Sequence, residues 1–302
     1  MGQKAVPFWD YLEERSIPSF IRHNPAQTNR ATVELMDRGA IKLAYVNYRH
    51  PRAVISVILI TKNEEKKIER CLDSVSWADE IIVVDSGSSD QTVALCEAKG
   101  AQVTITDWPG FGAQKNRALA LAQGPWILSL DADEYLRPEG QQEILSVIAR
   151  DTQEADAFAI PRESSYCGRI VKHSGWSPDY VVRLFRKDRC RFSDDLVHER
   201  LLVTGSVGKL CTPLCHESFD SLEEVLDKIN HYSTAAATMR HARGETASLF
   251  SAVMHGAWAF FRTFILRAGF LDGTTGFMLA VSNAEGVYYR YAKMMLLTRR
   301  GQ

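Results

Sequence analysis

Short apolar runs alternate with amphipathic stretches over residues 54–130. Four of these runs carry the composition of strands, and the runs of β-branched residues among them are typical of buried parallel strands. The predicted strands are residues 54–60, 80–84, 101–106 and 126–130. Between them, apolar spacing, capping residues and glycine stops predict helices. The predicted helices are residues 68–75, 91–99 and 114–122. This alternation indicates right-handed βαβ units on a mostly parallel sheet, so the predicted fold class is α/β.

Polar segments follow three of the predicted strands at their carboxyl ends. These segments are Thr61-Lys62-Asn63-Glu64, the loop that opens with Asp85-Ser86, and Asp131-Ala132-Asp133. Because ligands bind beyond the carboxyl ends of strands in parallel sheets, the three segments predict one shared site. An Asp-x-Asp pair alone is common in solvated turns, so this interpretation rests on the convergence.

The two carboxylates of Asp131 and Asp133 lie one residue apart on extended chain and therefore point to opposite sides. They can do different jobs, one at a divalent cation and the other at a sugar hydroxyl. Carboxylate oxygens of this kind suit Mg²⁺ or Mn²⁺ that bridges phosphates.

Four blocks in this order and spacing resemble the family 2 glycosyltransferases with the GT-A fold, a Rossmann-like, mostly parallel sheet flanked by helices. The blocks are Ile58–Glu64, Ile82–Asp90, Gly112–Leu119 and Leu130–Glu134. The resemblance covers about residues 53–220, and it implies inverting, single-displacement transfer from a UDP-sugar assisted by Mg²⁺ or Mn²⁺.

Three later segments narrow the resemblance to the bacterial lipopolysaccharide core β-glucosyltransferases. The segments are Trp258–Phe264, Gly269–Gly273 and Asn283–Tyr291. Those enzymes act on inner-core heptose, which implies UDP-glucose as the donor and a lipopolysaccharide core heptose as the acceptor. Another envelope polysaccharide or a lipid-linked acceptor stays open as an alternative, and so does a non-catalytic protein that binds sugar or membrane.

The family resemblance also implies which residues hold the nucleotide sugar and the metal. The nucleotide-sugar residues are Thr61, Asn63, Glu64, Asp85, Ser86, Lys115 and Asp131. The metal residues are Asp133 as a direct ligand, Asp131 through a bound water, and His198. Three alternatives stay open: Asp85 as a turn former, Lys115 as a merely solvated lysine, and His198 as a packed core histidine. Because Ser88 or Asp90 can cap the next helix, Asp85 is expected to be left for the nucleotide.

The acceptor side is expected to use later residues. The loop Arg191–Arg200 is the densest acidic stretch downstream, and it follows a predicted strand at 181–185. Glu199, with Asp195 second, is the predicted base, and a carboxylate base supplies about 10²–10⁴-fold. Trp176 and Asp179 pair an aromatic side chain with an acid, which suits a sugar platform as well as plain packing. Glu134 either supports the metal ligands or faces the acceptor.

The composition limits other classes of function. The chain has 302 residues and a net charge of −1, from 36 basic and 37 acidic residues, so no basic excess points to nucleic acid. The glycine-rich loop of nucleotidyltransferases and the Gly-x-Ser-x-Gly motif of serine hydrolases are both missing. Six scattered cysteines predict reduced thiols in a cytoplasmic protein. Cys211-x-x-x-Cys215-His216 suggests zinc only weakly, because no second pair has matching spacing.

The predicted domains are an extension at residues 1–52, a catalytic domain at 53–220 and a helical region at 221–302. The extension lacks a signal-peptide pattern, and an ordered cap, a disordered arm or an upstream start codon stay open. The run 247–261 is nearly all apolar but shorter than the ~20 residues of a spanning helix. Residues 246–302 hold Arg262, Arg267, Arg290, Lys293, Arg299 and Arg300 against Asp272 and Glu285. This pattern predicts a peripheral protein on the cytoplasmic face of the inner membrane, although a packed helical domain fits as well.

Overall fold

The computed structural model describes residues 31–37, 40–46, 55–150, 155–193 and 199–300. The chain divides into two units, Met1–Arg52 and Ala53–Gln302. In the first unit, β1 (Ala31–Asp37) and β2 (Ala40–Val46) form an antiparallel hairpin in which Ala31 pairs with Val46. The alternatives for the extension at residues 1–52 stay open.

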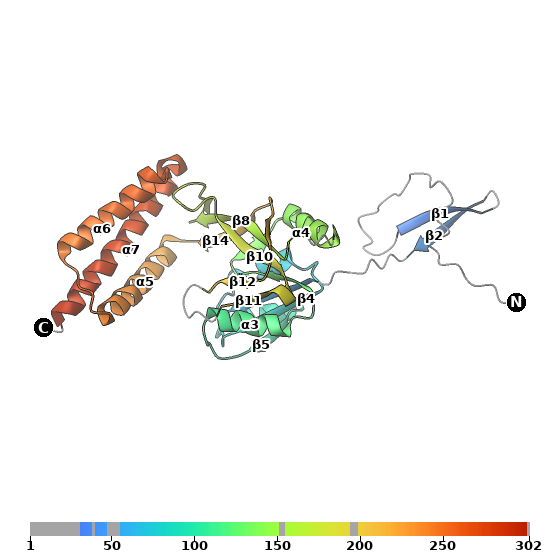
Figure 1. Ribbon diagram of the computed structural model, residues 1–302, viewed down its shortest axis with the longest axis horizontal. Coiled ribbons are helices and arrows are strands. Elements are labelled where there is room, and N and C mark those ends of the chain that lie inside the picture. Colours follow the sequence, from blue (N-terminus) through green and yellow to red (C-terminus); the bar gives the residue numbers. More distant parts are fainter. Residues whose placement is uncertain (1–30, 38–39, 47–54, 151–154, 194–198, 301–302) are drawn as a thin grey trace. The chain divides into compact units, whose positions relative to one another are not determined.

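A ten-stranded sheet forms the core of the second unit (Figure 1). The strands run in the order β5 (Gln102–Ile105), β4 (Glu80–Asp85), β3 (Ile55–Thr61), β6 (Trp126–Ser129), β10 (Tyr180–Arg186), β8 (Ala157–Tyr166), β14 (Leu214–Phe219) and β7 (Glu134–Leu136). Two further strands, β9 (Arg169–Ile170) and β13 (Val207–Lys209), pair with β8. The four strands β3 to β6 are parallel to their neighbours in that group, as predicted, whereas β10 is antiparallel to both β6 and β8.

Helices cover both faces of the parallel part of the sheet. The helices of this domain are α1 (Ile68–Ser74), α2 (Thr92–Ala98), α3 (Phe111–Leu121) and α4 (Pro138–Arg150). After β10 the chain forms the short 3-10 helix η1 (Lys187–Arg189) and a small antiparallel sheet of β11 (Cys190–Phe192) and β12 (Leu201–Val203). Val57 and Leu59 of β3 pack in one core cluster with Ile68 of α1. Ile58 points to the opposite face and packs in a second cluster with Ala118 of α3. The alternation along the strand therefore produces two buried layers.

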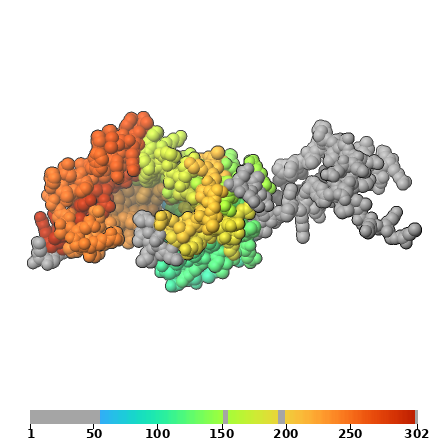
Figure 2. All heavy atoms as spheres, in the orientation of Figure 1, coloured from blue at the N-terminus to red at the C-terminus, as the bar shows by residue number. Residues whose placement is uncertain are grey.

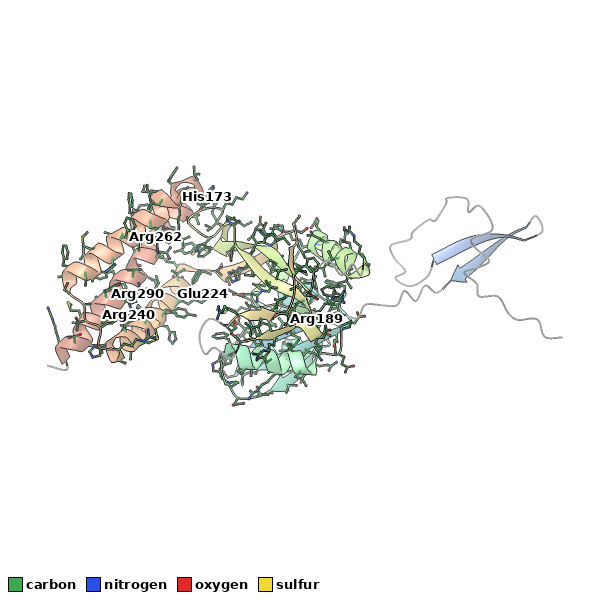
Figure 3. The ribbon with its side chains drawn as sticks, in the orientation of Figure 1. His173, Arg189, Glu224, Arg240, Arg262 and Arg290 are labelled. Atoms are coloured by element: carbon green, nitrogen blue, oxygen red, sulfur yellow. The ribbon has the colours of Figure 1, made fainter. Side chains whose placement is uncertain are left out.

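The carboxyl-terminal region is helical, as predicted. It comprises α5 (Leu222–Ala242), α6 (Leu249–Phe261), a π-helical turn η2 (Arg262–Leu266), a 3-10 turn η3 (Gly269–Asp272) and α7 (Gly273–Arg300). The helix α7 packs against α5 and against α6, and Figure 2 shows its red surface between the orange surfaces of these neighbours. On the α5 side, the guanidinium of Arg240 lies 5.4 Å from the centre of the Tyr291 ring, near Arg290 (Figure 3).

Candidate active site

The loops that follow β3 and β4 are joined by direct hydrogen bonds. The hydroxyl of Thr61 donates to Asp85 over 2.8 Å. Asn63 adopts a left-handed backbone conformation with a φ of 56°, which asparagine tolerates better than most residues. Its backbone N–H donates to the hydroxyl of Ser88, and its side-chain oxygen accepts the N–H of Ser89, each over 2.8 Å. The predicted nucleotide loops therefore lie together at the carboxyl ends of adjacent strands.

Asp85 forms the turn after β4, and the expectation that another residue would leave it free is wrong. The carboxylate is fully buried and accepts the N–H groups of Gly87 and Ser88 over 2.9 and 2.7 Å. Its other oxygen accepts the hydroxyls of Thr61 and Ser88. Asp90 accepts the N–H of Thr92, the first residue of α2, over 3.0 Å, but the cap position of this helix is Gln91, which makes no side-chain cap. A nucleotide contact by Asp85 stays a prediction.

Asp131 is 36% exposed at its side chain and joins a network of more deeply buried charges. Its carboxylate pairs with Arg183 and, over 3.1 Å, with the ammonium of Lys115. Arg183 also pairs over 2.6 Å with Glu134, whose other oxygen accepts the backbone N–H of Asp131 over 3.1 Å. The Lys115 side chain is only 7% exposed and also pairs with Glu199 over 3.1 Å. The alternative that Lys115 is a solvated surface lysine is therefore wrong.

The network sets opposite pKa shifts on its two central carboxyls. Burial alone would raise the pKa of Asp131, but Arg183 and Lys115 outweigh burial and hold this pKa well below its usual range. Burial raises the pKa of Glu134, and the negative charge of Asp131 adds to the effect against the opposing charge of Arg183. Asp131 is therefore an anion at every physiological pH.

Glu134 supports this network and does not face an acceptor. Its side chain is 0% exposed, so the acceptor-facing alternative is wrong for this residue. The physical reason is its position in β7, where its backbone pairs with His216 of β14 and its carboxylate is directed to Arg183 and Arg162.

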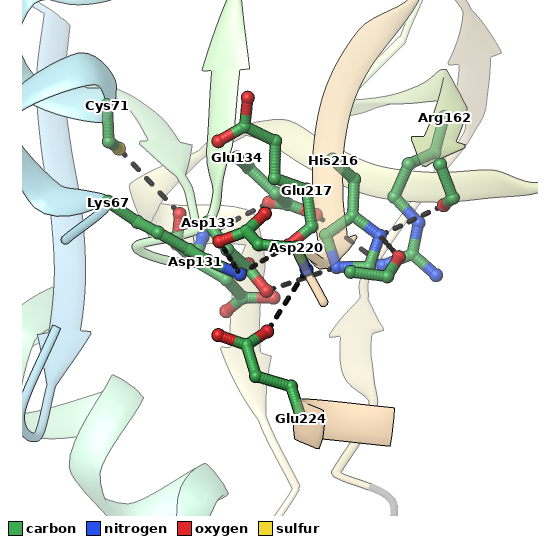
Figure 4. Close-up of polar contacts among 12 residues, drawn as sticks. Lys67, Cys71, Asp131, Asp133, Glu134, Arg162, His216, Glu217, Asp220 and Glu224 are labelled. Atoms are coloured by element: carbon green, nitrogen blue, oxygen red, sulfur yellow. Dashed lines mark hydrogen bonds and ion pairs between the residues drawn. The ribbon is translucent and has the colours of Figure 1, made fainter. Parts of the chain in front are cut away.

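Asp133 and His216 face each other beside this network, as Figure 4 shows. The His216 Nε2 atom lies 3.3 Å from the Asp133 carboxylate. The other ring nitrogen, Nδ1, lies 2.9 Å from the hydroxyls of both Ser164 and Ser218, which fix the ring. One carboxylate and one imidazole nitrogen so arranged fit two ligands of a divalent cation.

No group of three candidate ligands occurs among the described residues, so further ligands would be substrate oxygens or water. Of the other predicted metal and base residues, His198 and Asp195 lie outside the described residues. From the sequence, His216 was predicted only as a weak zinc ligand together with Cys211 and Cys215. Neither of these cysteines forms a disulfide bond, and the same holds for the other four.

A pocket of about 490 Å³ opens next to His216. Its lining residues come from the sheet domain and from α5. They are Arg162, Ser164, Gly175, Trp176, Pro178, Asp179, His216, Ser218, Phe219, Lys228 and Tyr232. The predicted acceptor residues Trp176 and Asp179 are both among them. Trp176 also stacks on Phe219 with 6.3 Å between ring centres, and Asp179 pairs with Arg162 over 2.6 Å. Packing and pocket lining thus coincide in Trp176.

Two more charged residues border the site. Burial and the nearby charge of Asp133 raise the pKa of Glu64 to about 7. Lys67 donates to the backbone oxygen of Glu217 over 2.7 Å and pairs with Asp220 over 3.3 Å (Figure 4). The roles of Arg183, Arg162 and Lys67 were not predicted, because their partners are distant in sequence.

The chain matches known proteins over most of its length. A family model described as glycosyl transferase family 2 matches residues 56–207. An uncharacterized glycosyltransferase of Rickettsia prowazekii is 31% identical over 259 residues, which covers 82% of this chain and 89% of that protein. The lipopolysaccharide core biosynthesis glycosyltransferase LpsC of Rhizobium meliloti is 28% identical over 261 residues, covering 80% and 94%.

Solved structures match less closely. A glucosyl-3-phosphoglycerate synthase from Mycobacterium tuberculosis, in complex with Mn²⁺, UDP and glucosyl-3-phosphoglycerate, is 30% identical with a TM-score of 0.32. That match covers 38% of this chain and less than half, 45%, of the synthase chain. The family match, the mixed sheet and the helical carboxyl-terminal region agree with the predicted GT-A fold. This chain belongs to glycosyltransferase family 2.

Proposed function

We propose that this protein transfers glucose from UDP-glucose, with inversion, to a heptose of the lipopolysaccharide core. The observation that carries the proposal is the pair Asp133 and His216 beside the ionised Asp131, where the segment after β6 meets β14. The similarity to LpsC supports the class of acceptor.

The residues at the rim of the sheet divide the work of donor binding. Thr61, Asn63, Glu64, Asp85 and Ser86 belong to the joined loops that would receive the uridine. Asp131, fixed by Lys115 and Arg183, presents a permanent anion where a ribose hydroxyl or a metal-bound water can donate to it.

Asp133 and His216 are the residues that would hold Mg²⁺ or Mn²⁺. When bound, such an ion neutralises the charge that develops on the leaving diphosphate. The hydroxyls of Ser164 and Ser218 hold the ring so that the Nε2 atom of His216 is directed at Asp133.

The acceptor hydroxyl must lose its proton as it attacks the anomeric carbon. The new bond from oxygen to carbon forms as the bond from carbon to the diphosphate breaks, and UDP leaves with the electron pair. Glu199 is our candidate for the base that takes the proton, with Asp195 second. In the structure Glu199 pairs with Lys115, which also pairs with Asp131, so the candidate base is connected to the residues proposed to bind the donor. Trp176 and Asp179 in the adjacent pocket offer an aromatic face and an acid to a sugar.

The proposal is tested with the Glu199→Gln and Asp133→Ala variants. Glu199→Gln should lose transfer from UDP-glucose to truncated lipopolysaccharide while calorimetric UDP binding stays intact. Asp133→Ala should lose the part of UDP binding that depends on Mn²⁺ or Mg²⁺ and is abolished by EDTA. Asp188→Ala, an exposed acid on η1, is the matched control and should behave as the wild type. Transfer by Glu199→Gln within a few-fold of wild type contradicts the assignment of the base.

A panel of donors and acceptors separates the alternatives. UDP-galactose and UDP-N-acetylglucosamine compete with UDP-glucose for the donor role, and other envelope polysaccharides or lipid-linked sugars compete for the acceptor role. Turnover with any of these acceptors, but not with core heptose, replaces the proposed acceptor and retains the glycosyltransferase. Sugar binding with no turnover at all favours the non-catalytic alternative.

Because the proposed acceptor is itself a lipid, we also propose that the protein works in the cytoplasm, peripherally on the inner membrane.

A further inference from the structure

The helix α6 and its π-helical turn expose a stripe of large apolar side chains. Phe250, Val253, Met254, Trp258, Phe261 and Leu266 are 43–74% exposed. Their spacing, with steps of one, three and four residues within α6 and of five across the π-helical turn, places them along one side of the helix. Single exposed apolar residues are ordinary on a protein surface, but a continuous stripe marks a surface that binds something.

The opposite side of α6 carries the small residues and is the side that packs. Ala252, Gly256, Ala259 and Thr263 are buried, and a Cβ atom on Gly256 would meet the backbone oxygen of Ala284 in α7 at 3.3 Å. A helix of a soluble protein usually buries its large apolar residues. Here the small residues face the protein and the large ones face outward, so packing within the chain does not explain the stripe.

The apolar surface continues onto the next elements. Phe270 and Leu271 of η3, and Phe277 of α7, are 49–60% exposed. The ring of Phe277 also lies 5.6 Å from the rings of both Phe260 and Phe264. These contacts join α6, η2, η3 and the first turns of α7 into one surface, which we call the α6 face.

The charge of the α6 face is positive. Residues 246–271 contain no Asp or Glu, and they hold Arg262 and Arg267, both exposed. The adjoining segment adds the exposed Arg169 of β9 and the exposed Lys172. Asp272, the next acid along the chain, accepts the backbone N–H groups of Lys172 and His173 over 3.0 Å each.

We propose that the α6 face docks onto the surface of an anionic lipid bilayer, with α6 lying in the plane of the membrane. Large apolar and aromatic side chains that enter the acyl boundary, with arginine and lysine beside them at the headgroups, are the chemistry of interfacial helices. A second copy of this chain fits the face less well, because Asp272, the acid of η3, is 6% exposed and already accepts from Lys172, His173 and Ser174.

The structure favours an in-plane helix over a spanning one. Leu249–Leu266 is long and apolar enough to cross a membrane by length and composition, with a mean hydropathy of 1.3. However, its 18 residues give roughly 27 Å at about 1.5 Å per residue, just short of the ~30 Å hydrocarbon core. Its inner side is also packed along α7, so crossing would carry Arg290 and Lys293 of α7 into the hydrocarbon.

The α6 face is fixed to the acceptor pocket by hydrogen bonds. Besides the two N–H groups, Asp272 accepts the hydroxyl of Ser174 over 3.0 Å, and the backbone N–H of Ser174 donates to the backbone oxygen of Arg267 over 2.9 Å. Figure 2 shows the yellow-green surface of this loop against the dark orange surface of the turns after α6. Because the next residues, Gly175 and Trp176, line the pocket, docking would hold the pocket at the lipid surface.

Vesicle flotation of the full chain tests the proposal. Vesicles of phosphatidylcholine with phosphatidylglycerol should carry the wild type upward more than phosphatidylcholine alone, and added salt should weaken the effect. The double variant Phe250→Glu/Trp258→Glu should partition roughly 100-fold more weakly, since each change removes an apolar contact worth about tenfold. The matched control Leu121→Glu/Leu145→Glu changes two exposed leucines of the sheet domain and should float as the wild type does. Unchanged thermal melts show that both variants fold.

Several results overturn the proposal. They are a wild type that stays at the bottom, a double variant that floats as well as the wild type, and a dimer in solution that the double variant converts to a monomer. Resistance to alkaline carbonate extraction would instead show a spanning helix and also overturn the in-plane docking. Flotation needs no turnover, so its failure is separate from failure of the proposed transfer, which the UDP-glucose assays measure.

Discussion

Replacing Arg183 by methionine tests whether the charge network, and not apolar packing alone, holds the candidate site together. The Arg183 side chain is 9% exposed and lies between the carboxylates of Asp131 and Glu134. The Arg183→Met variant leaves the fully buried Glu134 beside the partly buried Asp131, and the cations that still pair with these acids are Arg162 and Lys115. Removing one partner of a buried ion pair costs about 3–5 kcal/mol. For a unit of this size, that cost lowers Tm by roughly 6–20 °C.

The pH dependence gives the same prediction a second readout. The lowered pKa of Asp131 contributes stability above its unfolded-state pKa, and this contribution is lost as pH falls through the folded-state pKa. Without Arg183 this contribution shrinks, and the already raised pKa of Glu134 rises further, so its ionised form opposes folding. The gap in Tm between wild type and Arg183→Met should therefore be largest near neutral pH and narrow toward acid.

Thermal melts at about pH 7.5 and about pH 4.5 measure both effects. The first pH lies above the ordinary carboxyl pKa and the second lies near it. A second change, Glu134→Gln, removes one of the two uncompensated charges and should restore part of the lost Tm. The control is Arg169→Met, because Arg169 is exposed on β9. An Arg183→Met variant that melts within about 2 °C of wild type near neutral pH refutes the reasoning, since that is less than about 1 kcal/mol.

Three further predictions concern single residues. Gly112→Ala should lower Tm and weaken transfer, because the new Cβ would overlap the backbone oxygen of Ser193 and displace the segment that leads to the candidate base Glu199; an unchanged melt and unchanged kcat contradict this. Glu64→Gln should melt above wild type at about pH 8.5 but not at about pH 4, because burial and Asp133 raise the pKa of Glu64 to about 7, so its ionisation opposes folding only above its ordinary pKa; equal melts at the higher pH contradict this. Asp272→Ala should lower the free energy of unfolding, measured by chemical denaturation, by about 2–4 kcal/mol, since several donors around the η3 turn lose a charged acceptor; a loss below about 1 kcal/mol would show that these hydrogen bonds are dispensable.

The parallel part of the fold could be predicted because its signals are local. The apolar run of β3 and the i, i+3, i+4 pattern from Ile68 to Leu72 both report burial over a few residues. The placement of the three polar loops then follows from the rule for carboxyl ends of parallel strands. The prediction of α3 began three residues late because Gly112 disfavours a helix, and the structure requires glycine there to pass Ser193.

The other half of the candidate site was beyond sequence patterns. Arg183 reaches Asp131 because β10 inserts antiparallel between β6 and β8, and no local pattern encodes that pairing. His216 reaches Asp133 because β14 pairs with both β7 and β8, which sets its register over large separations along the chain. The sequence could not show that Asp85 holds its own turn, because the N–H groups of Gly87 and Ser88 come within reach of its carboxylate only in the folded turn.

The hydrogen bonds between the loops after β3 and β4 mean that an incoming nucleotide meets loops whose backbone is already ordered. Association then forfeits little chain entropy, so selectivity among nucleotides rests on fit and not on an ordering step. Deuterium exchange at the amides of Ser88 and Ser89 should accordingly be slow even before any ligand is added, since the hydrogens of both are held by side-chain oxygens.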